Sequence, residues 1–100
     1  MAKLYIAEFS NPGLTSYGAA LPMVKAPPLV EQTIAISGAS AQSAAFAGTT
    51  DIIRVHSDAI CSVLVGPNPT ATTSTMRLAA DQTEYFVVNP GDKIAVIANT

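Results

Sequence analysis

The chain has 100 residues, of which 49% are hydrophobic and 12% charged, and seven acidic against five basic residues give a formal net charge of -2. This length allows one domain with a modest core, and the hydrophobic fraction excludes a disordered chain. The acidic balance argues against nucleic-acid binding, which requires a basic surface. The single cysteine excludes a disulfide framework within the chain and a cysteine zinc site.

The sequence carries no recognisable targeting or membrane segment. Glu8 interrupts the N-terminal apolar run too early for a signal peptide. Elsewhere no apolar stretch approaches the ~20 residues of a membrane helix. We therefore expect a soluble protein, made in a reducing cytoplasm and without membrane contact.

The charged fraction of 12% is about half of what soluble domains usually have. Serine and threonine supply much of the polar surface instead, most densely in residues 70–75. Free monomers normally stay soluble through charges of both signs. The composition therefore favours a surface partly covered by neighbouring molecules, although an ordinary β domain with a hydroxyl-rich surface explains it equally well.

Alternating apolar residues predict short β-strands along most of the chain. The first strand is predicted at Lys3–Phe9, with Leu4 and Ile6 on one face. Further alternating runs cover residues 31–37, 51–57, 61–65, 75–79, 83–88 and 93–97. Asn89-Pro90-Gly91-Asp92 has the proline and glycine of a type II turn. Ser57-Asp58-Ala59 is a short connection that predicts a hairpin between the two runs beside it.

Two segments are ambiguous. Residues 40–47 are rich in alanine and would suit either a short helix or a strand. We favour a strand, because an isolated helix of this length is marginal in water. Residues 11–28 contain four of the seven prolines, which predicts an irregular arm. Arms of that length in a small domain are usually functional or lie against another surface.

The strands and turns together predict an all-β fold. About seven to eight short strands, with turns roughly every 8–12 residues, are typical of a small antiparallel β-sandwich, here jelly-roll-like, with an irregular N-terminal arm. We expect residues 1–100 to form a single domain. Within it, residues 1–28 are the N-terminal strand and proline-rich arm, and residues 29–100 are the body of the sandwich.

Residues able to carry out chemistry are few and scattered. His56, the only histidine, is predicted on the outer face of its strand, and a metal site needs three or four convergent ligands. Cys61 could approach His56 across the predicted hairpin, but no third orienting group accompanies them, so we expect Cys61 in the core. The carboxylates, Glu8 included, are predicted at solvated edges and turns. We therefore predict no catalytic, cofactor-binding or metal-ligating residue, and an enzyme is the lowest-ranked function.

The second half of the chain resembles a known group of proteins. The residues that carry the likeness are Ile53-Arg54-Val55, Cys61-Ser62-Val63, Gly66-Pro67-Asn68-Pro69-Thr70-Ala71-Thr72, Met76-Arg77-Leu78, Glu84-Tyr85-Phe86 and Asn89-Pro90-Gly91-Asp92-Lys93-Ile94-Ala95-Val96-Ile97. They are similar to small virion structural proteins of tailed bacteriophages. The resemblance implies a β-sandwich decoration (cement) protein that binds the capsid surface and stabilises capsomer junctions.

The resemblance also implies partners and a location. The partners would be the major capsid protein and copies of the chain itself, in a homo-oligomer expected to be a trimer. The location would be the capsid surface of the virion, with no nucleic acid, membrane or cofactor involved.

The first predicted strand could add to a neighbour's sheet as an edge strand, so its apolar residues are predicted to contact a partner. The apolar residues of the arm are predicted to contact a partner as well. These interface residues are Leu4, Tyr5, Ile6, Phe9, Leu14, Tyr17, Leu21, Met23 and Val24.

Two alternatives share most of these features. One is a β-sandwich binding module for a receptor or a carbohydrate, and the other is an adaptor of the phage tail, neck or fibre. A carbohydrate-binding module usually exposes aromatic side chains, and this chain has three tyrosines and no tryptophan.

Overall fold

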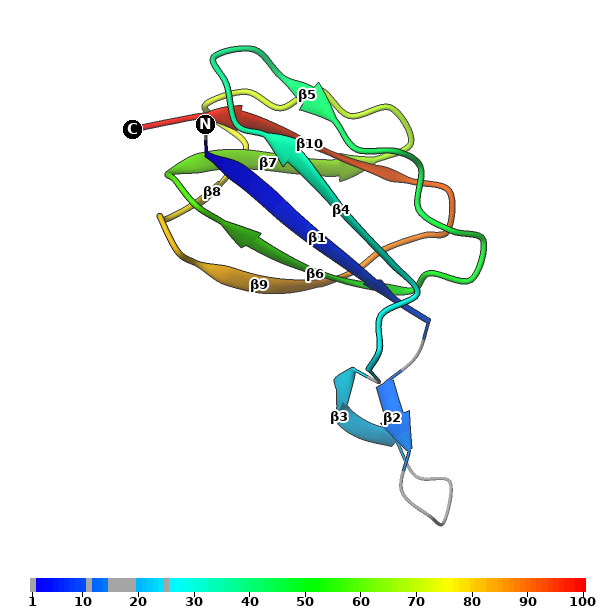
Figure 1. Cartoon of the computed structure of the whole chain (residues 1–100). Helices are drawn as coiled ribbons and strands as arrows, with labels where there is room; N and C mark the ends of the chain where they lie inside the picture. The colour runs from blue at the N-terminus through cyan, green and yellow to red at the C-terminus, as the bar shows by residue number, and fades with distance from the viewer. Residues whose placement is uncertain (1, 11, 15–19, 25) are drawn as a thin grey trace.

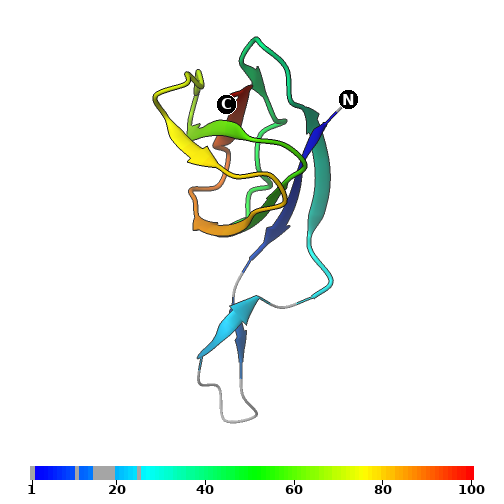
Figure 2. The same ribbon diagram turned by 90° about the vertical axis from the view of Figure 1, so that its left-hand side faces the viewer.

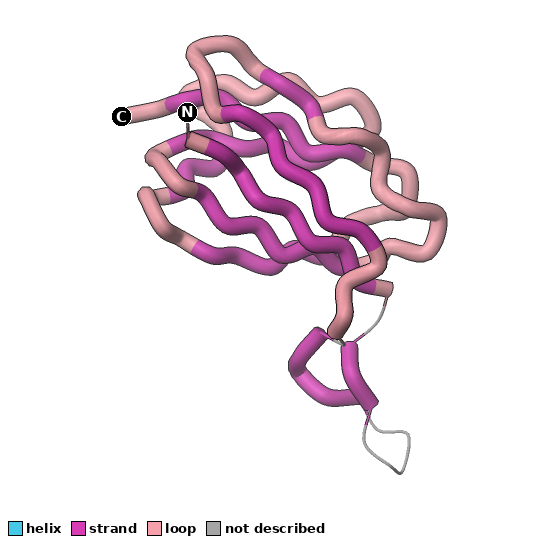
Figure 3. Tube along the Cα trace, in the orientation of Figure 1, coloured by secondary structure: helices cyan, strands magenta, loops and turns pink. Residues whose placement is uncertain are grey.

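The computed structural model describes residues 2–10, 12–14, 20–24 and 26–100, with side-chain surroundings for residues 2–10 and 26–100. It confirms an all-β sandwich of two four-stranded antiparallel sheets (Figure 1). The first sheet has the order β4-β1-β6-β9, and the second sheet has the order β5-β10-β7-β8. Figure 3 shows only strands and loops in these ranges, and no helix there is long and apolar enough to cross a membrane.

The sandwich strands are β1 Lys3–Phe9, β4 Val30–Ala35, β5 Ala41–Gln42, β6 Ile52–Ser57, β7 Cys61–Gly66, β8 Met76–Leu78, β9 Thr83–Val87 and β10 Lys93–Ala98. Two further strands, β2 (Pro12–Leu14) and β3 (Ala20–Val24), pair antiparallel with each other. They project from the sandwich beyond the end of β1 and the start of β4 (Figures 1 and 2). Both strands lie within residues 11–28, the segment that was predicted to be an irregular arm. From here on, the arm means the β2–β3 pair.

The core lies between the two sheets and follows the period of two in the sequence. Ile53 and Val55 of β6 are fully buried, as are Ile94 and Val96 of β10. A fully buried side chain of this kind contributes about 1.5–3 kcal/mol relative to an exposed one. The buried cluster comprises Leu4, Ile6, Ile34, Ile36, Phe46, Ile53, Val55, Cys61, Val63, Leu78, Val88, Ile94 and Val96.

Several short connections cross from one sheet to the other. β6 lies in the first sheet and β7 in the second, so the hairpin predicted at residues 57–59 is wrong. A short connection can span the ~10 Å between stacked sheets as readily as it joins neighbouring strands. The predicted turn at residues 89–92 crosses as well; its Gly91 has φ 83° and the Asp92 N–H donates to the Asn89 carbonyl (3.2 Å).

β1 is an interior strand. It pairs with β4 on one side and with β6 on the other, so the prediction that it adds to a neighbour's sheet as an edge strand is wrong. Three of its predicted interface residues, Leu4, Ile6 and Phe9, are buried and cannot contact a partner. Alternation in the sequence reports which face of a strand is buried, but not how many neighbours the strand has.

Residues 40–47 form a strand only at Ala41–Gln42, and the chain that follows is held by a buried carboxylate. Glu8 of β1 is fully buried, contrary to its predicted solvated position. Its Oε1 accepts hydrogen bonds from the Ala47 N–H (2.9 Å) and the Thr50 hydroxyl (2.8 Å), and its Oε2 accepts one from Gln32 (3.1 Å). A buried charge is tolerated only when it is paired or hydrogen-bonded in this way. Glu8 therefore anchors residues 43–50 to the first sheet.

Replacing Glu8 by alanine is expected to destabilise the fold strongly. One buried donor, on Thr50, and two partly buried donors, on Gln32 and Ala47, would lose their acceptor, and an unsatisfied buried donor costs about 1–3 kcal/mol. We therefore expect a loss of about 2 kcal/mol or more in the free energy of unfolding, measured with urea. The control is Glu31→Ala, at an exposed position of β4. Equal, small effects of the two substitutions would contradict the anchoring role.

Candidate functional site

The two sheets differ in what covers their outer faces. On the second sheet, the loop formed by residues 67–75 lies over the strands: its Ala71 is buried, and so is Ser62, an outward-facing residue of β7. The Asn99 side chain fixes this loop by donating to the Ser62 hydroxyl (2.7 Å) and to the Thr73 carbonyl (3.1 Å). The outer face of the first sheet carries exposed residues along β1, β4 and β9, and we call it the open face.

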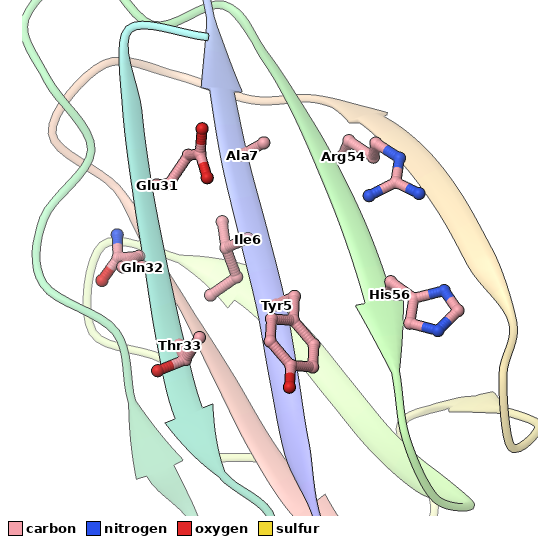
Figure 4. A pocket seen from close by; sticks show the side chains of 8 residues that line it. All are labelled: Tyr5, Ile6, Ala7, Glu31, Gln32, Thr33, Arg54 and His56. Atoms are coloured by element: carbon pink, nitrogen blue, oxygen red, sulfur yellow. The ribbon is translucent and has the colours of Figure 1, made fainter.

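The strand register places a hollow on this open face. Ala7 of β1 lies between Glu31 of β4 and Arg54 of β6, and in the next row Tyr5 lies beside His56. Since Ala7 is small, the longer side chains around it border an open hollow of about 470 Å³ (Figure 4). Its lining residues are Tyr5, Ile6, Ala7, Glu31, Gln32, Thr33, Arg54 and His56.

The hollow combines an aromatic ring with groups of both charges. Tyr5 is 43% exposed, and its ring centroid is 6.5 Å from that of His56 at a tilt of 50°. In Figure 4 the Glu31 carboxylate and the Arg54 guanidinium lie on opposite sides of Ala7. These groups suit a ligand with several hydroxyl groups, or one with both charges, better than a strongly charged ligand.

His56 stands at one corner of the face, near two aspartates. Its Nδ1 is 2.8 Å from the Thr83 hydroxyl, and its Nε2 is 3.9 Å from a carboxylate oxygen of Asp81. Asp58 brings a third possible ligand atom, and the three atoms lie within 4.8 Å of one another. Ligand atoms on one tetrahedral zinc ion are closer, at ~3.4 Å. Both carboxylates are exposed, so these groups could hold a divalent cation only after moving inward, and we assign no metal to them.

Asp81 was expected at a solvated turn, and its position near His56 was not predicted. It occupies the turn between β8 and β9 with φ 58°, and its N–H donates to the Ser57 carbonyl (2.7 Å). This bond brings the turn to the end of β6, beside His56. The approach of Asp81 to His56 depends on β9 pairing with β6, which the local sequence pattern does not encode.

Cys61 is buried in the core, as expected. Burial raises the pKa of its thiol, against a smaller lowering by a hydrogen bond with the Ser57 side chain. Because β6 and β7 lie in different sheets and His56 faces outward, Cys61 and His56 do not form a pair. A protonated, buried thiol is a poor nucleophile.

The predicted interface residues are separated by the fold. Tyr5 is exposed on the open face, whereas Leu4, Ile6 and Phe9 are in the core. The side chains of Leu14, Tyr17, Leu21, Met23 and Val24 lie outside the described residues. The structure adds exposed large side chains that the sequence analysis had not selected: Leu29, Val30, Leu64, Met76, Tyr85 and Val87.

Comparison with known proteins leaves the family open, because no protein-family model, curated protein or solved structure matches the chain.

The buried thiol of Cys61 is expected to be inert while the chain is folded. Because the side chain is fully buried and its pKa is raised, a disulfide reagent should modify it at least ~100-fold more slowly than in the unfolded chain. The measurement is thiol release in buffer and in guanidinium chloride. Equal rates in the two conditions would show that Cys61 is accessible.

Proposed function

We propose that the chain is a non-enzymatic virion structural protein, a capsid decoration (cement) protein of a tailed bacteriophage. It binds the capsid surface and stabilises the junctions between capsomers. Its partners are the major capsid protein and further copies of the chain, and it is made in the host cytoplasm. The observation that carries the proposal is a folded sandwich from which the arm projects (Figures 1 and 2).

The arm is suited to attachment. The structure measures 47 × 25 × 21 Å along its principal axes, and the arm extends beyond one end of the sandwich. A two-stranded hairpin outside a core is at best marginally stable in water. Docking on the surface of a partner would give it the burial that its own sandwich does not supply.

The sandwich is suited to act as an inert body. Every buried side-chain nitrogen and oxygen in the described part of the chain has a hydrogen-bond partner. The low charged fraction and the exposed apolar residues of the open face favour contact with other molecules. The likeness of the second half of the sequence to phage virion proteins supports the choice of a capsid over other partners.

The arm can be tested separately from the sandwich. β1 and β4 are neighbours, and the Leu29 N–H donates to the Glu8 carbonyl (2.7 Å) where they meet the arm. A turn of roughly two to four residues containing Asn-Gly can therefore replace residues 11–26 without moving either strand. Deletion of residues 1–28 would be unsuitable, because it removes β1 from the middle of the first sheet.

We expect the arm-replacement variant to keep its melting temperature within a few degrees and to lose binding to capsids. The measurement is co-sedimentation with shells assembled from the major capsid protein of the same genome. Tyr5→Ala, which leaves the arm intact, is the control for a contact made by the sheet face alone. Undiminished binding without the arm would contradict the proposed attachment.

A second candidate function is a binding module for a receptor or a carbohydrate, on a phage tail, neck or fibre. The hollow favours it, because the Tyr5 ring lines the same hollow as Arg54 and Glu31. A sugar that binds there should shift the amide NMR signals of β1, β4 and β6. Arg54→Ala should weaken binding about tenfold, whereas Arg77→Ala on the second sheet should not change it. The absence of any such shifts across a glycan panel would reject this function.

A further inference from the structure

β9 (Thr83–Val87) is an open edge of the first sheet, since it pairs with β6 alone. Val87 and Tyr85 on this strand are 85% and 54% exposed, the highest values among the exposed large hydrophobic residues of the described chain. The opposite edge, β4, has a neighbouring segment: Gln32 accepts a hydrogen bond from the Ala44 N–H (3.0 Å). β9 is thus the less protected edge.

The register shows which backbone groups of β9 point away from the sheet. The Ser57 N–H donates to the Gln82 carbonyl (3.1 Å), and the Val88 N–H donates to the Asp51 carbonyl (2.8 Å). In an antiparallel ladder, alternate residues direct their N–H and C=O groups to the same side. The even-numbered residues from 82 to 88 therefore face β6. The groups of Thr83, Tyr85 and Val87 point to the open side, where none has a backbone partner among the described residues.

β9 also lacks the features that normally protect an edge. Proteins usually block exposed edges with lysine, proline or a β-bulge. The sequence Thr-Glu-Tyr-Phe-Val contains no lysine or proline, and its pairing with β6 is continuous. Its one charge, Glu84, accepts a hydrogen bond from Gln82 (2.7 Å) and is half-buried. The strand is rich in residues with high β-propensity.

We propose that β9 pairs antiparallel with β9 of a second copy, about a twofold axis beside Tyr85, so that two first sheets become one continuous sheet. The strand is self-complementary in this register. Tyr85 lies opposite its own copy, Thr83 lies opposite Val87 of the second copy, and Glu84 lies opposite Phe86 of the second copy. Every outward N–H and C=O of β9 gains a partner, and no like charges face each other.

The proposed pairing identifies the surface through which copies of the chain associate. It rests on the proposed function in one respect, because that function leads us to expect self-association. A twofold axis closes the assembly at two copies. The result is a dimer, in place of the trimer expected from the resemblance. The pairing extends the sheet sideways, so the hollow and the arm stay accessible.

The twofold axis allows a charge-exchange experiment at Tyr85, whose exposed side chain can be replaced with little effect on the fold. Tyr85→Lys and Tyr85→Glu each place like charges opposite each other across the axis, so each variant alone should dimerise about tenfold or more weakly than the wild type. An equimolar mixture should recover the dimer as a Lys–Glu heterodimer. Met76→Lys, at an exposed position of the second sheet, should leave dimerisation unchanged.

Sedimentation velocity over a range of concentrations measures these states. A wild type that is monomeric up to its solubility limit would overturn the pairing, as would a mixture that stays monomeric when the wild type dimerises. Amide hydrogen exchange gives a second readout, in which Tyr85 and Val87 should be protected only at high concentration and Glu84 and Phe86 at every concentration. The co-sedimentation experiment with capsids and the arm-replacement variant does not depend on sedimentation velocity or hydrogen exchange. Failure of the edge pairing can therefore be distinguished from failure of the proposed decoration role.

Discussion

The fold depends on the two-sided backbone pairing of β1. This strand joins β4 to β6 in the first sheet by pairing with both. Its buried Glu8 also fixes the segment that leads from β5 to β6. Because β1 and β4 are neighbours in the sheet, the arm is an insertion between adjacent strands, with both of its ends at the same corner of the sandwich. An insertion of this kind can be shaped by a partner without disturbing the core.

Placing β1 inside the sheet also determines which strand forms the open edge. With β1 paired on both sides, the first sheet ends at β9, whose outward side chains include Tyr85 and Val87. The outer face of the second sheet is partly covered by the chain's own loop at residues 67–75, while Leu64 and Arg77 there remain exposed. The surfaces that we propose for contact with other molecules are the arm, the open face with its hollow, and the β9 edge.

Much of the fold can be predicted from the sequence, because burial on one face leaves a period of two. That pattern places Ile53 and Val55 in the core and marks the strands, and the Pro-Gly pair at residues 90–91 identifies a turn. The pairing of the strands cannot be predicted in this way, because local alternation does not show which sheet a strand joins. This is why the hairpin at residues 57–59 and the edge position of β1 were wrong.

The candidate surfaces were harder to predict for related reasons. Tyr85 and Val87 alternate with Phe86 and Val88, so both faces of β9 are apolar in sequence and the pattern cannot tell which is outside. Glu8 was predicted to be solvated because the residues that donate hydrogen bonds to it, such as Thr50, are distant in sequence and cannot be identified from the local pattern. The hollow depends on a small Ala7 between two longer neighbours, a juxtaposition created only by strand register.

The central claim is that this sandwich acts by contact on the surface of a phage particle, and electron cryo-microscopy of that particle tests it most directly. The account predicts density for the sandwich over the junctions between capsomers, with the arm lying against the shell. A well-resolved shell without such density, in particles shown by mass spectrometry to contain the chain, would contradict it.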